Sequence, residues 1–172
     1  MDYSIKENII LNITKDKWQS ILAYYSECMM SSLSCSIASV NKSGEPNVTP
    51  IGSLVLKNDF SGYFFDKFTN TLSNNLDHNN KICVLLVNSG KWFWLKSLLK
   101  NKFIKPSGLK LSGTAGKKRK ALEEEIEVFR KRIQPLKIFR GYHTLWDNLE
   151  YVRDIKFTEY YPVFTGKMTF DL

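Results

Sequence analysis

The stretch "ASVNKSGEPNVTPIGSLVL", residues 38–56, predicts the type of fold. Two β-prone runs flank the cluster NKSGEP, where Gly44 can supply the turn and Pro46 precedes the second run. Just before it, Cys35 and Ile37 alternate with polar neighbours, so a β-hairpin is expected over 34–56. Pro50 cannot donate to a ladder, which places the second strand at a sheet edge, at a bulge, or where the backbone stays free for a ligand.

Further strands and helices are expected on both sides of this hairpin. Thr14 can cap a first helix, whose apolar face would contain Trp18, Ile21, Leu22 and Tyr25. Strands are expected over 62–66, 81–88, 108–117, 151–161 and 162–170, and helices over 15–30, 67–80, 91–100 and 121–134.

Three of these helices have predicted faces. Leu72 and Leu76 should point inward from the short helix within 67–80, and Trp92, Leu95 and Leu99 share one face of the helix over 91–100. The helix over 121–134 should bury a stripe of Leu122, Ile126, Phe129 and Ile133, and Pro135 should end it.

The order of elements predicts a mainly β, α+β fold. A succession of β-hairpins with a few helices between them favours an antiparallel barrel with helices at its rim over a doubly wound parallel sheet. The sequence shows no repeat and no linker, so one domain over 1–172 is expected.

Composition points to a cytoplasmic globular protein. Hydrophobic residues make up 43% of the chain and charged residues 24%. The N-terminal residues have neither a basic region nor a continuous apolar core, and no apolar run is long enough for a bilayer. Neither a secretory signal nor a membrane partner is therefore expected.

The cysteines are expected to be reduced thiols packed as small hydrophobic groups. Cys28, Cys35 and Cys83 show no CxxC spacing, and the chain has two histidines, His78 and His143. These residues do not match a zinc pattern, so no metal is expected.

Positive charge is concentrated in one segment. From Lys91 to Arg140 the chain has 15 basic and four acidic residues, whereas the remainder has 10 basic and 13 acidic residues. An anionic ligand should therefore contact this segment. The basic run 117–120 is interpreted as a solvated turn between a strand and a helix.

Two stretches are candidates for a binding site. The loop after residue 66 is rich in hydroxyl and amide side chains and leads into a short helix. Such a loop can bind a phosphate at the helix N-terminus. Alternatively, it is an ordinary polar loop with Thr71 or Ser73 as the N-cap. The stretch "NSGKWFWLKSLLKNK", residues 88–102, combines three aromatic residues with four lysines. Nucleic acid, a membrane surface or a pocket for an anion could each suit it.

Three blocks in register resemble the FMN-binding split-barrel family related to pyridoxamine 5′-phosphate oxidase. They are residues 38–56, the stretch "GYFFDKFTNTLSNNLDHNNKICVLLVN" over 62–88, and the stretch "LKLSGTAGKKRKALEEEIEVFRKR" over 109–132. The resemblance covers about residues 34–134. It implies a homodimer of six-stranded split barrels, with one FMN in each of two clefts between the subunits.

The resemblance also implies the cofactor-binding residues. The phosphate would meet Lys67, Thr69, Thr71, Asn74 and Asn75. The isoalloxazine ring would lie along Thr49, Pro50, Ile51, Gly52, Ser53, Phe65 and Asp66. Trp92, Phe93 and Trp94 would either cover the flavin or substrate pocket of the neighbouring subunit or form the dimer core, with Trp92 and Trp94 as the candidates for cofactor contact.

The chain departs from the family pattern at two places. Many members have arginine or lysine where this chain has Asn70, Thr71 and Leu72, so the phosphate charge would rest on Lys67 or on a lysine of the partner. The chain ends "FTGKMTFDL" without the Arg-x-His motif of true pyridoxamine phosphate oxidases, so pyridoxine phosphate is not the expected substrate.

The expected function is that of an FMN-dependent oxidoreductase acting on an unidentified small molecule, with a nicotinamide as a candidate donor. Because the flavin performs the redox step, no acid–base pair or nucleophile is required. The alternative is a split-barrel binding module for haem, a deazaflavin or another ligand without FMN redox activity. A nucleic-acid binder is a further rival, which would lose affinity steeply with salt.

Overall fold

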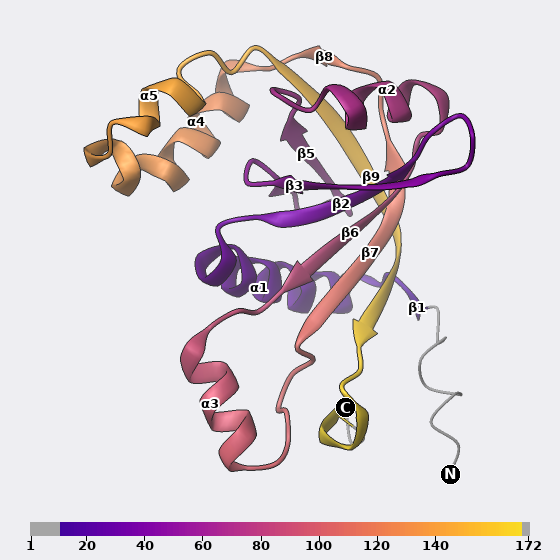
Figure 1. Ribbon diagram of the computed structural model, residues 1–172, viewed down its shortest axis with the longest axis vertical. Coiled ribbons are helices and arrows are strands. Elements are labelled where there is room, and N and C mark those ends of the chain that lie inside the picture. The colour runs from indigo at the N-terminus through magenta and orange to yellow at the C-terminus, as the bar shows by residue number, and fades with distance from the viewer. Residues whose placement is uncertain (1–10, 170–172) are drawn as a thin grey trace.

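A computed structural model describes residues 11–169, which form a strongly curled antiparallel sheet with helices around it (Figure 1). Six strands have five residues or more: β2 (Cys35–Val40), β3 (Pro46–Ile51), β5 (Ser61–Phe65), β6 (Lys81–Val87), β7 (Gly108–Ala115) and β9 (Tyr151–Val163). Three two-residue strands extend the sheet: β1 (Leu11–Asn12), β4 (Val55–Leu56) and β8 (Arg119–Lys120).

The sheet has the order β3-β2-β6-β7-β9-β5-β4, with β1 and β8 paired to β9. All pairs are antiparallel, and the sheet curls into a half-barrel. This architecture confirms the predicted split-barrel α+β fold, with three short strands beyond the expected six.

The predicted hairpin is present. β2 pairs with β3 from Cys35↔Ile51 to Val40↔Pro46, and Gly44 in its turn has φ +84°, a conformation that glycine adopts at little cost. β3 has β2 as its neighbour at the end of the sheet order, so the strand that contains Pro50 is an edge strand.

Within residues 11–169, five α-helices flank the sheet: α1 (Lys15–Ser32), α2 (Asn70–His78), α3 (Lys91–Leu99), α4 (Glu123–Ile133) and α5 (Gly141–Trp146). The Thr14 hydroxyl accepts a hydrogen bond from the Lys17 amide, which confirms the predicted cap of α1. Figure 1 shows α2 and α5 near one end of the sheet and α3 near the other.

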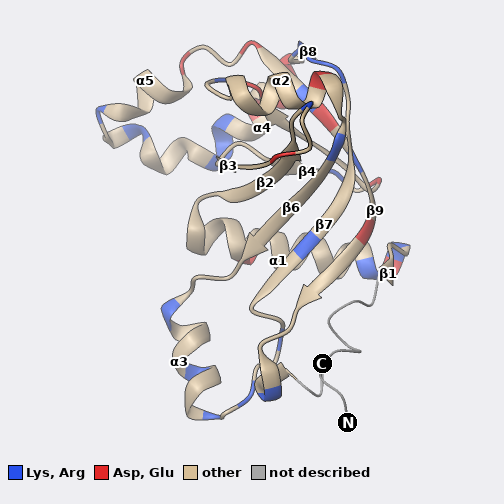
Figure 2. Ribbon diagram, turned by 45° about the vertical axis from the view of Figure 1, so that its right-hand side comes forward, with Lys and Arg blue, Asp and Glu red and all other residues tan. Residues whose placement is uncertain are grey.

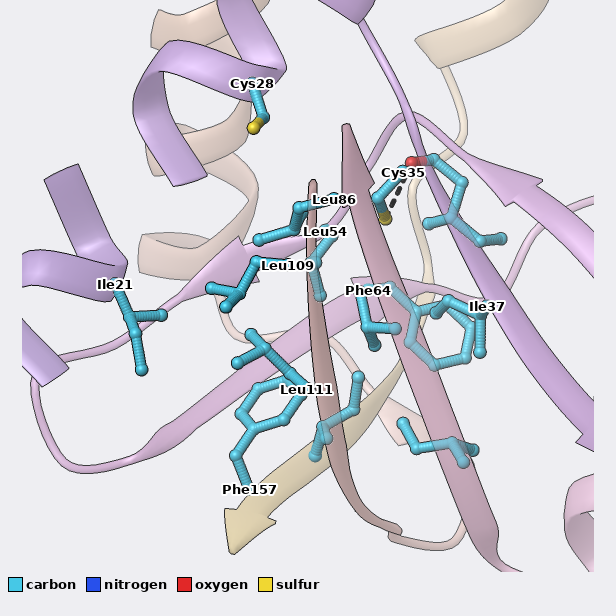
Figure 3. Packing of buried hydrophobic residues seen from close by; sticks show 14 of the residues in the cluster. Ile21, Cys28, Cys35, Ile37, Leu54, Phe64, Leu86, Leu109, Leu111 and Phe157 are labelled. Carbon is cyan, nitrogen blue, oxygen red and sulfur yellow. Dashed lines mark hydrogen bonds between the residues drawn. The ribbon is translucent and has the colours of Figure 1, made fainter. Parts of the chain in front are cut away.

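The core lies between α1 and the concave side of the sheet (Figure 3). Trp18 is fully buried, and its indole Nε1 donates to the Lys57 carbonyl at 2.8 Å. Leu72 and Leu76 of α2 are buried in the same cluster, as predicted. A second cluster joins β5 and β9 to the helices that follow residue 122, through Phe65, Phe129 and other side chains.

Two cysteines pack in this core as hydrophobic groups. Cys28 and Cys35 are buried and unbridged, and the Cys35 thiol donates to the Ile51 carbonyl at 3.3 Å. Burial raises the pKa of Cys28 to about 11 and that of Cys35 to about 12. Both thiols therefore stay protonated near neutral pH and are poor nucleophiles.

Gly113 is required where β7 crosses close to β9. A Cβ atom at this position would lie 2.2 Å from the Lys156 carbonyl oxygen. The ladder between the two strands shifts register at Ser112/Gly113, which leaves Thr158 as the extra residue of a bulge. The glycine of the stretch "LSGTA" thus permits the sheet to curl tightly here.

The structure corrects two details of the sequence prediction. The strands expected over 151–161 and 162–170 are one strand, β9, which is followed by a short 3₁₀ helix, η3 (Gly166–Thr169); Phe170 lies outside the described residues. Leu122 precedes α4 and is 59% exposed, so the stripe begins at Ile126, which is half-buried. α4 ends at Ile133, just before Pro135, as predicted. Pro135 lies in the 3₁₀ helix η2 (Gln134–Ile138), because its fixed φ suits a first helical turn.

Helix α3 forms as predicted, and the face of Trp92, Leu95 and Leu99 does not pack against the rest of the described chain. Trp92 is 74% exposed and Leu99 is 77% exposed. Helix α5, which comes shortly after η2, was not predicted.

None of the helices within residues 11–169 combines the length and the apolar character needed to cross a bilayer.

Candidate functional site

A cavity of about 380 Å³ opens at the free edge of β3, between the end of β5, the start of α2, and α5. Eight of the residues expected to bind the cofactor line it: Thr49, Pro50, Ile51, Gly52, Ser53, Phe65, Lys67 and Thr69. The structure therefore brings together two segments that are separate in the sequence, residues 49–53 and residues 65–69.

Hydrogen bonds fix the segment that follows β3. The Phe65 amide donates to the Ser53 hydroxyl at 3.1 Å, which joins this segment to β5. From α4, the guanidinium of Arg132 donates to the carbonyls of Gly52 at 2.6 Å and Leu54 at 2.5 Å. The wall of the cavity formed by residues 49–53 is therefore held from two sides.

Lys67 provides positive charge at one end of the cavity. It is the one cation among the described residues that line the cavity. Its Nζ donates to the Leu145 carbonyl at 3.2 Å and lies 4.8 Å from the centroid of the Phe68 ring. The side chain is half-buried, so it can exchange this carbonyl for an anion that enters the cavity.

The N-terminus of α2 lies next to Lys67. Thr69 is the N-cap residue, but its hydroxyl donates to Asp66 and accepts no hydrogen bond from the first turn of α2. The first amides of the nine-residue helix therefore lack a side-chain cap, and their dipoles favour a negative group.

Asp66 faces the protein interior and does not line the cavity. Arg153 of β9, which is 1% exposed, donates through Nε to Asp66 at 2.8 Å and through a terminal nitrogen to Ser73 and Asp77 of α2, each at 2.8 Å. Burial opposes ionisation of Asp66, but hydrogen bonds from Thr69, Arg153 and Ser73 outweigh it and lower the pKa of this carboxyl group. The ionised pair fixes α2 against β9.

Three predicted phosphate contacts lie outside the cavity. Thr71 and Asn74 are exposed on α2, whereas Asn75 is buried and its amide donates to the Ser39 hydroxyl at 3.0 Å. Asn75 therefore has a structural contact, and Thr71 lies in the first turn of α2 with its side chain in solvent.

Trp92 and Trp94 are far from the cavity of their own chain. They belong to α3, at the opposite end of the sheet from α2 and α5 (Figure 1). Trp94 is half-buried, and its Nε1 donates to the Asn88 carbonyl at 2.8 Å. Trp92 faces solvent.

Sequence reasoning missed the wall of the cavity formed by α5 and the turn after it. Leu145, Trp146 and Leu149 line the cavity, and Leu149 is buried beside Phe65 in the second core cluster. A sequence signal was available, because Tyr142, Trp146 and Leu149 recur at helical spacing. The anchoring roles of Arg132 and Arg153 had no comparable signal.

Within residues 11–169, His, Cys, Asp and Glu side chains do not gather in threes around any point that could hold a metal ion.

The curled sheet and its helices define a split-barrel protein of the α+β class. The family model for pyridoxamine 5′-phosphate oxidase matches residues 21–156. The chain therefore belongs to the pyridoxamine 5′-phosphate oxidase family. No curated protein sequence matches the chain.

Several solved structures share this fold at low sequence identity. An FMN-binding protein from Syntrophomonas wolfei is 16% identical, with a TM-score of 0.58, and the match covers 89% of this chain and 96% of that protein. HupZ from Group A Streptococcus is 17% identical, with a TM-score of 0.55 and coverages of 90% and 96%. HutZ, a haem storage protein from Vibrio cholerae, is 13% identical, with a TM-score of 0.51 and coverages of 84% and 92%.

Proposed function

We propose that this protein is a homodimeric flavoprotein that binds FMN in the cavity at the edge of β3 and acts as an oxidoreductase on a small molecule. The observation that carries the proposal is the arrangement of the cavity. Its lining has an apolar part, which includes Pro50, Ile51, Phe65 and Trp146, and a cationic part at Lys67 beside the α2 N-terminus. A planar ring that carries a phosphate chain has the same two parts.

The residues present fit this cofactor. Backbone groups of residues 49–53 can hydrogen-bond the ring edge, and Phe65, Trp146 and Leu149 provide apolar walls that exclude water. Lys67 and the uncapped amides of α2 can hold the phosphate. Bound FMN would supply hydride and electron transfer, and the protein would position the ring and its substrate.

The cavity lining explains why the redox chemistry would belong to the cofactor. Among the described residues that line it there is no carboxylate, histidine or cysteine. At this site the role of the chain is therefore to bind the ligands and to orient them. A nicotinamide donor is one reductant that such a site could accept. The substrate that we propose is a small molecule other than pyridoxine phosphate.

An uncovered sheet face supports the homodimer. Cys83 and Leu85 of β6 alternate with the buried Val84, so they face outward together with Ala38 of β2 and Val87. In Figures 1 and 2, no helix of the described chain covers this side of β2, β6 and β7. The same face also contains Ser36, Lys110 and Ser112, which pair in register with Leu85 and Cys83, so it is partly apolar and partly polar. An uncovered sheet face of this kind can pack against a second copy in a symmetric dimer.

One observation supports a second candidate, a module of the same fold that binds haem, a deazaflavin or another ligand without FMN redox activity. The first turn of α2 contains Asn70, Thr71 and Leu72 and has no cation, and Leu72 is 0% exposed. With Lys67 as the cation of the cavity, a ligand that carries less charge than FMN would also be accommodated.

Visible absorption spectra separate the two candidates. The purified protein is mixed with FMN in one sample and with haem in another, and each is desalted before its spectrum is recorded. A retained flavin spectrum that bleaches when NADH or NADPH is added supports the flavoprotein. A retained haem Soret band together with loss of all FMN contradicts it and favours the binding module.

A further inference from the structure

A second cavity, of about 390 Å³, lies between α1, the loop that follows α3, and the strands β7 and β9. Its inner wall is formed by side chains from three elements: Ile21 and Tyr24 of α1, Leu109 of β7 and Tyr160 of β9. It shares no lining residue with the cavity at the edge of β3. A ligand in the second cavity would therefore not compete directly with one at β3.

The inner wall of the second cavity is apolar. Ile21 is 3% exposed, and it belongs to the same core cluster as Leu109 and Tyr160 (Figure 3). Pro106 and Pro162 add further apolar surface. Among the described residues that line this cavity there is no carboxylate, histidine or cysteine. The lining therefore accepts a hydrocarbon group and is suited to binding without catalysis.

Hydrogen bonds fix the walls of the second cavity. The Tyr24 hydroxyl donates to the Pro106 carbonyl at 2.8 Å. Burial raises the pKa of Tyr24, so this hydroxyl stays protonated and keeps its partner. The loop that contains Pro106 is held in turn by the Ser107 hydroxyl, which lies 2.9 Å from the hydroxyl of Thr165. A preformed cavity of this kind lowers the entropic cost of binding.

Two lysines line the second cavity, and they differ in their surroundings. Nζ of Lys105 is paired with Glu27 at 2.5 Å, so the charge of Lys105 is already compensated. Nζ of Lys17 lies 5.5 Å from the centroid of the Tyr160 ring and has no carboxylate partner among the residues that the structure describes. Lys17 is therefore the cation that is available to an anionic ligand.

The spacing along α1 indicates the length of the ligand. Lys17 and Tyr24 are about two turns apart, which corresponds to about 10 Å along the helix axis. A ligand with its anionic head group at Lys17 would extend over this distance along Ile21 and Leu109 before it reaches Pro106. A medium-chain fatty acid combines one carboxylate with an apolar chain of this length.

We propose that the second cavity binds a free medium-chain fatty acid, with its carboxylate at Lys17 and its hydrocarbon chain along Ile21 and Leu109. The site remains open in the proposed homodimer. Leu109 faces α1, whereas the adjacent Lys110 points to the uncovered face on the opposite side of the sheet. The inference does not depend on FMN, because the cavity at β3 contributes no residue to it.

Isothermal titration calorimetry with decanoate, below the concentration at which it forms micelles, tests the inference on the full chain. One molecule should bind per chain, and decanol, which has the same chain without the charge, should bind more weakly. Lys17→Glu should weaken decanoate binding by roughly fivefold, as expected for a partly exposed charge pair. Lys15→Glu is the matched control, because Lys15 is an exposed lysine of α1 that does not line the cavity.

A second pair of variants tests the location of the ligand. Ser20 and Ser26 are exposed serines of α1 whose hydroxyls each donate to the carbonyl four residues earlier, but only Ser20 lines the second cavity. Ser20→Trp fills the cavity and should abolish decanoate binding, whereas Ser26→Trp should leave it unchanged. Thermal melts followed by circular dichroism check that both variants fold. In the wild-type chain, decanoate should shift the methyl NMR signals of Ile21 and Leu109.

Failure of decanoate to bind the wild-type chain would overturn the inference, as would methyl shifts confined to other residues. Equal affinity for decanoate and decanol would show that no carboxylate is recognised at Lys17, which also contradicts it. If the chain binds vesicles of phosphatidylglycerol but no free decanoate, a lipid surface is the partner and the proposed ligand is wrong. Because no flavin is present in these experiments, their outcome is independent of the proposed cofactor.

Discussion

Replacement of Lys67 by alanine should weaken FMN binding and leave riboflavin binding nearly unchanged. Riboflavin has the same ring as FMN but lacks the phosphate, so the comparison isolates the interaction between Lys67 and the phosphate. If the ring lies along residues 49–53, both ligands keep that contact in the variant.

The expected magnitude follows from the environment of Lys67. A hydrogen bond to a charged group contributes roughly 1.5–3 kcal/mol. Lys67 is only half-buried, and its Nζ must leave the Leu145 carbonyl at 3.2 Å before it can reach a phosphate. The lower end of the range therefore applies, and a loss of about 1.5 kcal/mol corresponds to an increase in Kd of roughly tenfold.

The assay is titration of protein into each flavin while the flavin fluorescence is recorded. Wild type, Lys67→Ala and Lys42→Ala are compared, because Lys42 is an exposed lysine in the β2–β3 turn and should not affect either ligand. An equal loss of affinity for FMN and riboflavin in Lys67→Ala would refute the assignment of Lys67 to the phosphate.

Three further outcomes are expected. Thr71→Arg places a cation on the exposed side of the first turn of α2, so it should strengthen FMN binding by roughly threefold to tenfold in the same titration, whereas Thr71→Gln should not. Leu111→Ala removes a fully buried core side chain and should cost about 3 kcal/mol, or about 6–12 °C in Tm by calorimetry, whereas the exposed Leu122→Ala should change Tm little. The hydrogen bond from Arg119 is the main reason that the pKa of Glu125 falls from 4.5 to about 2. The ionised Glu125 carboxylate therefore contributes its full stabilisation above pH 4.5, and this stabilisation is lost as the pH falls toward 2. The stability difference between wild type and Glu125→Gln, measured by urea unfolding, should therefore shrink over this range; a constant difference would contradict the account.

The sequence predicted most of the fold because local patterns and tertiary packing agree. The turn at Gly44 and the edge position of Pro50 follow from backbone chemistry, and both are confirmed. One error arose where the helical pattern extends beyond the helix: Leu122 matches the spacing of the stripe of α4 but lies before the first turn. The predicted face of α3 is in solvent in the single chain, so its expected contact with a second subunit stays a prediction.

Prediction of the candidate site was limited by long-range contacts. The segments 49–53 and 65–69 were identified from the resemblance, and the structure places them around one cavity. The partners that fix them come from distant positions, such as Arg132 on Gly52 and Arg153 on Asp66. A charged residue in a helix or strand gives no sequence signal that its partner lies about 80 residues away.

The crystal structure of the protein grown with FMN would test the central claim most directly. Density is expected for the flavin ring along residues 49–53 and for the phosphate at Lys67 and the N-terminus of α2. Density for FMN at another site, or an empty cavity at saturating FMN, would contradict it.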